Sequence, residues 1–101
     1  MPAELRIEAP GQAVLAGELV FATAPALLEQ GAALFQPAGD ALVLDLAEVT
    51  QTDSAGLALL LEWLDEARRI GKSLRFCHLP ATLLGIARLS NAEGLLPEAE
   101  G

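Results

Sequence analysis

The chain has 101 residues, which is the length of one domain and too short for two. Hydrophobic residues make up 52% of it and aromatic residues only 4%, so its core has to be built from Leu, Ala, Val and Ile, which favours a sheet covered by helices. Fourteen acidic against six basic side chains give a formal net charge of -8, which repels phosphate backbones and anionic lipid headgroups. Binding to nucleic acid or directly to lipid is therefore not expected.

A few segments bear on the compartment in which the protein works. Cys77 is the only cysteine, so it cannot form an internal disulfide, and residues 1–10 have neither the basic nor the apolar region of a signal peptide. The longest apolar run, residues 57–61, is much shorter than the roughly 20 residues that a membrane-spanning helix needs. We expect a cytoplasmic protein with no segment inserted directly into a membrane.

The first elements in chain order are a hairpin and a helix. Short apolar segments around Leu5 and Val14 are separated by residues 9–11, whose Pro-Gly pair is a turn signal, and they predict an opening β-hairpin. Apolar residues then recur at helical spacing after Pro25, which suits the first turn of a helix. This pattern predicts a helix that ends before residues 37–39.

A buried strand and a long helix occupy the middle of the chain. ALVLDL, residues 41–46, is almost continuously apolar and predicts a central strand buried on both faces. Residues 55–70 then carry leucines at the i, i+3, i+4, i+7 spacing of a helix, and Gly71 stands where a helix commonly ends. We therefore predict a strand over residues 41–46 and a helix over residues 55–70.

The last third of the chain repeats the alternation of strand and helix. SLRFCHL, residues 73–79, predicts a strand, and residues 81–90 predict a helix opened by Pro80 and followed by a short turn around Leu95. The polar tail over residues 97–101 is expected to fray. Two β-helix-β connections after a hairpin give a mixed sheet of four to five strands with parallel central strands and helices mainly on one face. The sequence therefore predicts a single α/β domain over residues 1–101.

Asp53 and Ser54 stand immediately before the long helical pattern. The Asp53 carboxylate can accept hydrogen bonds from the free amides of the first helical turn, which makes it an N-cap without any further role. Ser54 occupies the first helical position, where a phosphate on its hydroxyl would face free backbone N–H groups. Serine is common at helix starts for capping alone, so this position permits phosphorylation without requiring it.

The candidates for catalysis and metal binding are few. A serine nucleophile needs a base, and the only histidine, His78, has no orienting acid beside it in the sequence. His78 and Cys77 also form no zinc-ligand spacing, and the chain has neither a Walker A loop nor a Gly-x-Ser-x-Gly elbow. We expect no catalytic residue, no metal site and no cofactor.

The long helix carries a second apolar stripe beside its main one. Leu59, Trp63 and Ile70 lie roughly 110–150° from the centre of the leucine face at 100° per residue. They could pack against a neighbouring helix, or they could form a protein-binding patch centred on the only tryptophan. Glu62 and Glu66 beside the stripe indicate that this side is partly solvated, and the sequence leaves both alternatives open.

The stretch LVLDLAEVTQTDSAGLALLLEW resembles the STAS domain family. The hallmark of that family is a buried strand ending in Asp-Leu, then a short loop, then Asp-Ser or Asp-Thr followed by small residues and Gly-Leu. These positions are here Asp45, Leu46, Asp53, Ser54, Ala55, Gly56 and Leu57. LAGEL, residues 15–19, is similar to the end of the family's second strand, so the resemblance covers most of the chain in the right order.

The resemblance implies a STAS-type fold whose function runs through protein partners, in one of two branches. In the MlaB-like branch a small cytoplasmic subunit binds the ATPase of an ABC transporter that moves phospholipids, an MlaF-like protein, and so sits peripherally at the inner membrane. In anti-sigma factor antagonists the serine at the position of Ser54 is phosphorylated by a partner kinase. The runs GLALLLEW and LLP are closer to the MlaB-like branch. A nucleotide-binding STAS module is less well supported, because the chain has no basic cluster for phosphates.

One departure from the family pattern favours the transporter branch. STAS proteins usually place an aspartate near the serine after Gly-Glu-Leu, and here that position is Val20, followed by Phe21. An apolar surrounding suits a permanent interface better than a phosphorylation switch. The resemblance and the residues together predict a partner-binding surface, with a homodimer possible when the partner is absent, and assign to this surface Thr52, Asp53, Ser54, Ala55, Leu59 and Trp63.

Overall fold

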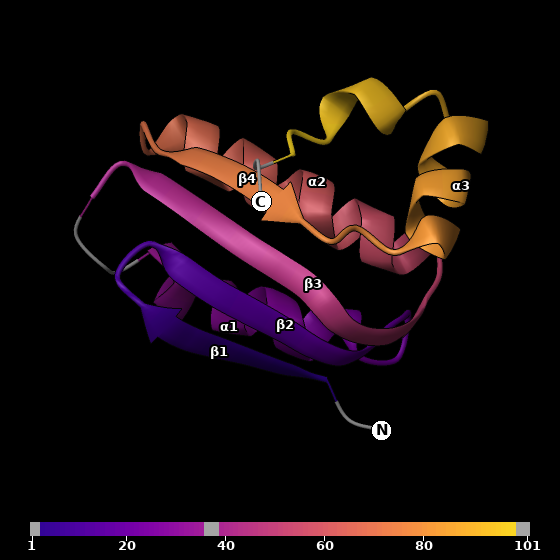
Figure 1. The fold of residues 1–101 in the computed structure, drawn as a ribbon, viewed down its shortest axis with the longest axis horizontal. Helices are drawn as coiled ribbons and strands as arrows, with labels where there is room; N and C mark the ends of the chain where they lie inside the picture. Colours follow the sequence, from indigo (N-terminus) through magenta and orange to yellow (C-terminus); the bar gives the residue numbers. More distant parts are fainter. Residues whose placement is uncertain (1–2, 36–38, 99–101) are drawn as a thin grey trace.

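A four-stranded mixed sheet with helices packed behind one face makes up the fold (Figure 1). The computed structural model describes residues 3–35 and 39–98. The strands lie in the order β1-β2-β3-β4, with the first pair antiparallel and the other two pairs parallel. This arrangement confirms the predicted α/β architecture with parallel central strands.

The opening hairpin forms as predicted. Strand β1 spans Glu4–Ala9 and β2 spans Gln12–Leu19, and they pair antiparallel. Gly11 in the connecting turn has a φ of 80°, a backbone conformation that glycine adopts without steric cost. The carbonyl oxygen of Gly11 also accepts a hydrogen bond of 2.8 Å from Val43 N, which links the turn to the next strand of the sheet.

The two parallel strands differ from prediction in length. Strand β3 spans Ala41–Thr52 rather than residues 41–46, because its second half, which is mostly exposed, continues to pair with β2 as far as Leu19 opposite Thr52. Strand β4 spans Ser73–Cys77 rather than residues 73–79. It ends early because His78 has a φ of 57°, which breaks the extended conformation.

Helices α1 (Ala24–Phe35) and α2 (Ser54–Arg69) lie side by side behind the sheet, while α3 (Ala81–Leu89) packs beyond the end of β4 (Figure 1). The described bounds agree with prediction to within about two residues, although residues 36–38 of the expected stop after α1 lie outside the described residues. No helix in the described ranges combines the length and the apolar character that crossing a membrane demands.

The core lies between the sheet and the two long helices. Alternate residues in the first half of β3 point into the core, as expected for a strand. The largest fully buried side chains of the core come from every strand except β1 and from all three α-helices. These side chains are Trp63, Phe76, Leu15, Leu19, Leu27, Leu34, Leu44, Leu46, Leu60 and Leu83.

The segment after α3 forms a short 3-10 turn, η1 (Glu93–Leu95), as predicted around Leu95. The prediction that residues 97–101 fray differs from the structure at Pro97 and Glu98, which pair with β4. Phe76 N donates a hydrogen bond of 2.8 Å to Pro97 O, and Glu98 forms a parallel bridge with Phe76. The backbone pairing with β4 is what holds this segment, and residues 99–101 lie outside the described part of the chain.

Candidate functional site

Asp53 caps the start of α2, as the sequence predicts. The residue is in an extended conformation, and its Oδ1 accepts hydrogen bonds from Ala55 N at 2.9 Å and from Gly56 N at 3.4 Å. Two amides that the helix itself leaves unpaired are thereby satisfied. The negative charge also lies at the positive end of the helix dipole, which stabilises it further.

The second oxygen of the Asp53 carboxylate ties the helix start to another loop. Asp53 Oδ2 accepts from Phe21 N at 3.0 Å, which connects α2 to the turn between β2 and α1. Thr23 stabilises this turn through its side chain: Oγ1 donates a hydrogen bond to Glu18 O at 2.6 Å and accepts one from Val20 N at 3.0 Å. The backbone of Phe21 is therefore fixed although its side chain is 80% exposed.

A glycine allows α2 to begin this close to β2. A Cβ at Gly56 would lie 2.5 Å from Leu19 O and 2.6 Å from Thr52 Oγ1, and neither distance is tolerated by real Cβ atoms. Asp53 N also donates to Leu19 O at 3.3 Å, so the end of β2 and the start of α2 are held in contact. This contact places Ser54 on the surface, where it is exposed, beside the half-buried Thr52 and Ala55.

An apolar groove of about 380 Å³ runs next to this helix start, between α1 and α2. We call it the α1–α2 groove and define it by Phe21, Ala24, Pro25, Leu28, Ala55 and Ala58. Phe21 and Leu28 are large apolar side chains with 80% and 47% exposure, which is unusual for adjacent residues of a small domain. Neither was assigned to a site from the sequence, although a phenylalanine in the short turn between the second strand and the first helix is a signal that could have identified the first.

Leu59 and Trp63, by contrast, are not surface residues, and the prediction that they extend an exposed contact patch is wrong. They are 4% and 2% exposed, and α1 packs over Trp63 at Gly31. The alternative that the second stripe packs against a neighbouring helix is correct for these two, while Ile70 is 46% exposed. Leu59 belongs to the hydrophobic core and also lines the α1–α2 groove.

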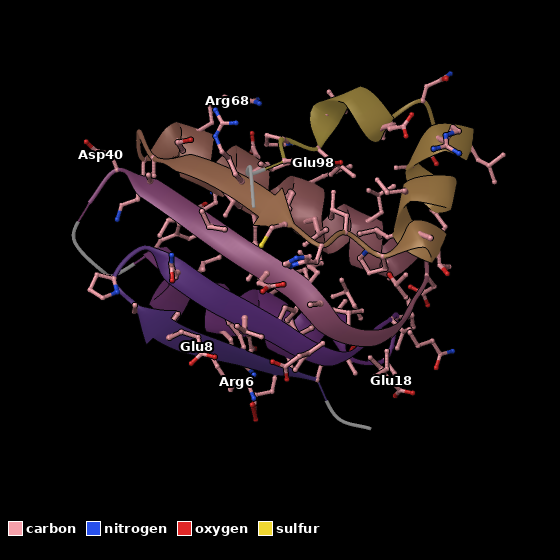
Figure 2. All side chains as sticks on the ribbon, viewed as in Figure 1. Arg6, Glu8, Glu18, Asp40, Arg68 and Glu98 are labelled. Carbon is pink, nitrogen blue, oxygen red and sulfur yellow. The ribbon has the colours of Figure 1, made fainter. Side chains whose placement is uncertain are left out.

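The charge around the groove is negative. Among the described residues, Glu62 lines it and no basic side chain does. The arginines that Figure 2 labels lie elsewhere: Arg6 is on β1, where it pairs with Glu48 over 2.6 Å, and Arg68 is near the end of α2. The groove therefore combines an apolar surface with one glutamate, in a protein whose net charge is -8.

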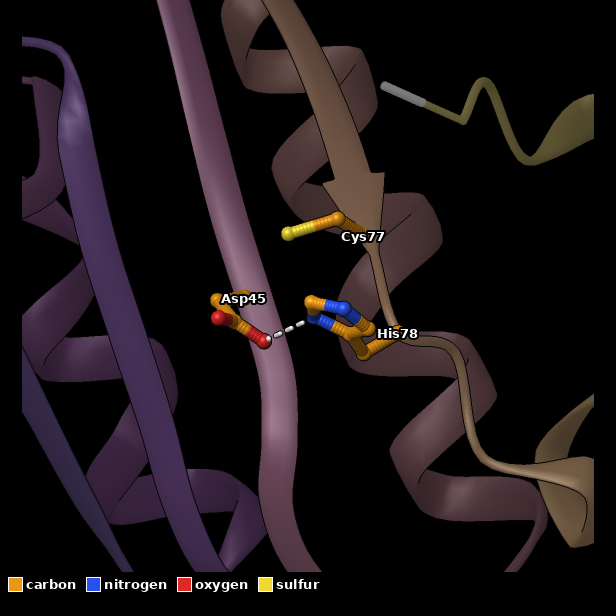
Figure 3. A group of neighbouring side chains, drawn as sticks. All are labelled: Asp45, Cys77 and His78. Atoms are coloured by element: carbon orange, nitrogen blue, oxygen red, sulfur yellow. Dashed lines mark hydrogen bonds and ion pairs between the residues drawn. The ribbon is translucent and has the colours of Figure 1, made fainter. Parts of the chain in front are cut away.

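A second polar cluster lies on the face of the sheet that the helices leave open (Figure 3). Asp45 Oδ1 and His78 Nδ1 are 2.9 Å apart, so the acid that the sequence did not place beside His78 comes from β3. Partial burial raises the pKa of Asp45, but hydrogen bonds from Ala47 N and His78 outweigh it, and the net pKa is lowered. Burial, and then the Asp45 carboxylate, raise the pKa of the Cys77 thiol.

The fold is a small α/β domain whose second helix begins at a capped, partly exposed surface. A family model described as Mlab, STAS domain matches residues 6–97, and the chain therefore belongs to the STAS domain family. The resemblance in the motif around Asp53 and Ser54 is confirmed. A comparison with curated protein sequences gives no significant match.

Solved structures of other STAS domains have the same fold. The anti-sigma factor antagonist SpoIIAA of Bacillus, in its unphosphorylated form, matches with a TM-score of 0.71 and 18% identity over 97% of this chain and 88% of that one. An anti-sigma factor antagonist from Mycobacterium paratuberculosis gives 0.72 and 24% over 98% and 85%. A sulfate transporter family protein from Wolinella succinogenes gives 0.67 and 16% over 92% and 75%. At these identities the likeness shows the fold alone.

STAS domains are generally non-catalytic regulatory domains, and they commonly interact with partner proteins such as kinases or transporter subunits. The structure places the six residues predicted to bind a partner in two environments, of which only one is accessible to a partner. Thr52, Asp53, Ser54 and Ala55 meet at one surface, which we call the helix-start surface, whereas Leu59 and Trp63 lie beneath α1.

Proposed function

We propose that this protein is a non-catalytic STAS subunit that binds the ATPase of an ABC transporter moving phospholipids, an MlaF-like protein, and stabilises or activates it. The contact is made by the helix-start surface together with the α1–α2 groove. The observation that carries this proposal is the exposed side chain of Phe21, held beside Ser54 by the bond from its amide to Asp53. Through such a complex a cytoplasmic protein would be placed at the inner membrane.

Phe21 has the properties of an interface anchor. Its backbone is fixed before any partner arrives, so docking costs less conformational entropy than ordering a mobile loop would. Burying a phenylalanine side chain contributes about 1.5–3 kcal/mol, which corresponds to about a ten- to hundredfold change in affinity. Aromatic residues in the centre of a contact commonly carry much of the binding energy.

The chemistry of the groove also restricts its partner. Apolar side chains beside Glu62 fit a surface that presents an apolar side chain next to a Lys or Arg. Such charges act mainly on the association rate, so salt should slow complex formation more than it speeds dissociation. The family model, which is described by the name Mlab, supports a transporter subunit as this partner.

The experiment begins with affinity purification of the tagged protein from its own cells in mild detergent, followed by mass spectrometry. We expect an ABC ATPase with its permease. The variant Phe21→Ala should lose this complex, and Leu89→Ala is the matched control because Leu89 is also a large apolar side chain, 90% exposed, on α3. Recovery of the ATPase by Phe21→Ala at the wild-type level, with both variants folded, would contradict the proposal.

A second candidate is an anti-sigma factor antagonist controlled by phosphorylation of Ser54. It is supported by the exposure of Ser54 at the first position of α2 and by the structural likeness to proteins of that class. Intact mass after incubation with ATP and the co-purifying kinase tests it. A single added phosphate that Ser54→Ala removes would replace the transporter proposal with this one.

A further inference from the structure

Three different metal-ligating side chains meet on the open face of the sheet, where β3 and β4 run side by side (Figure 3). They are Asp45 of β3, Cys77 at the end of β4 and His78 directly after it. A carboxylate oxygen, the thiol sulfur and an imidazole nitrogen all lie within 4.8 Å of one another. Within residues 3–35 and 39–98 this is the one group of three or more such side chains.

Two features of the backbone bring the cluster together. Asp45 and Cys77 are register partners in the parallel pair of β3 and β4, so their side chains stand next to each other on the same face. His78 follows Cys77 and would point to the opposite face if the strand continued, because successive side chains alternate. Its φ of 57° breaks this alternation and returns the imidazole to the side of Asp45.

The positive φ of His78 is itself informative. A non-glycine residue adopts this conformation only at a cost in backbone strain, and such positions are concentrated at functional sites. A glycine or asparagine would end β4 in the same way with less strain. Histidine at this position therefore supplies a side chain that the backbone turn does not need.

We propose that Asp45, Cys77 and His78 bind one divalent transition-metal ion, for which Zn²⁺ fits best. Thiolate and imidazole ligands select borderline-soft metals and disfavour Ca²⁺ and Mg²⁺, which take oxygen ligands. Three protein ligands leave the fourth tetrahedral position open to water or to a group from another molecule. The location on the uncovered face, with His78 60% exposed, gives an ion and a fourth ligand a way in.

The distances require only small side-chain movements. A tetrahedral ion with bonds of about 2.0–2.3 Å holds its ligand atoms about 3.3–3.6 Å apart. Asp45 Oδ1 and His78 Nδ1, now 2.9 Å apart, would separate slightly, and Cys77 Sγ would move inward from within 4.8 Å. On binding, the Cys77 thiol releases its proton to solvent, and a neutral His78 carries its proton on Nε2 so that Nδ1 can bind the ion.

Co²⁺ is the probe, because a thiolate ligand gives it a charge-transfer absorption band and a tetrahedral site gives it strong visible bands. The protein is purified without a histidine tag, reduced and stripped of metal before titration. We expect saturable binding of one Co²⁺ with both sets of bands, and displacement by Zn²⁺. Zn²⁺ should also raise the melting temperature, because an ion that binds only the folded state stabilises it.

Two variants test the ligands and one serves as the control. Cys77→Ser should lose the charge-transfer band, and His78→Asn, which keeps a residue that tolerates positive φ, should lose saturable binding. Asp40→Asn, directly before β3, removes an exposed carboxylate that is not part of the cluster and should bind as the wild type does. The absence of a charge-transfer band in folded, reduced wild type would overturn the proposal. Binding of Co²⁺ by Cys77→Ser and His78→Asn with the same affinity as the wild type would overturn the proposal as well, since the ion would then be bound by other groups.

Discussion

The contact between α1 and α2 rests on the absence of a side chain at Gly31. A Cβ built there would overlap Trp63 Nε1 and lie 3.2 Å from both Cδ1 and Cε2 of the indole ring. Trp63 is 2% exposed, and its buried Nε1 has no hydrogen-bond partner within residues 3–35 and 39–98. The substitution Gly31→Ala, made alone and together with Trp63→Phe, measures the energetic contribution of this contact.

The magnitudes follow from opposing contributions at the two positions. Alanine in the interior of a helix is more stable than glycine by about 1 kcal/mol. Overpacking against the indole costs about 1–3 kcal/mol, so Gly31→Ala should leave the wild-type protein unchanged or less stable by up to about 2 kcal/mol. Phenylalanine at position 63 vacates the place of Nε1 and removes the unpaired N–H. In that background Gly31→Ala should therefore stabilise the protein by about 1 kcal/mol.

The assay is urea denaturation of the four proteins followed by far-UV circular dichroism, since Trp63 is the only tryptophan and its fluorescence disappears in two of them. The coupling free energy between the substitutions should be about 1–3 kcal/mol, with the double variant more stable than the sum of the single variants predicts. Additive effects, or stabilisation by Gly31→Ala in the wild type, would refute the close packing of α1 on Trp63. Truncation by Trp63→Ala should cost about 3–5 kcal/mol, which is the expected effect of a core residue.

Asp53→Ala removes the acceptor for the amides of Ala55, Gly56 and Phe21, so the free energy of unfolding should fall by about 1–2 kcal/mol. Thermal denaturation would measure this, with Ser54→Ala as the neighbouring control, and an unchanged melting temperature would mean that the cap contributes nothing. Asp45→Asn tests the lowered pKa of that carboxyl, which binds its proton less tightly in the folded than in the unfolded chain. The resulting stabilisation is present above the ordinary value of 3.8 and is lost as the pH falls below it through the lower folded pKa. The stability difference between wild type and Asp45→Asn should therefore stay constant above about pH 5 and shrink as the pH falls through 3.8 and below it, and a difference that does not change there would contradict the shift.

The order and type of the elements could be predicted because each carries a local signal. The leucine spacing of α2 and the apolar run of β3 are properties of a short segment, and both identify the element correctly. The second half of β3 could not be predicted in this way, because its mostly exposed residues are extended only by pairing with β2. The end of β4 depends on the left-handed backbone of His78, a conformation that histidine adopts more often than most residues but that the apolar pattern of residues 73–79 does not indicate.

The candidate site was predictable where one residue acts on its neighbours in sequence. Asp53 caps the next helix, so its role follows from its position alone. The burial of Trp63 depends instead on Gly31, and the exposure of Phe21 on a bond to Asp53, 32 residues away. The pairing of His78 with Asp45 likewise spans 33 residues. Helical spacing gives the direction of a side chain but does not show whether another helix covers it.

The pairing of Pro97 and Glu98 with Phe76 has a consequence for how copies of this protein meet. The outer edge of β4 would otherwise offer unpaired N–H and C=O groups to any extended chain, which is how sheets of separate molecules join. The segment after η1 occupies this edge at Phe76, and the alternating charges of Glu4, Arg6 and Glu8 follow the other edge on β1. A chain that is 52% hydrophobic is thereby protected at both edges against strand-to-strand aggregation.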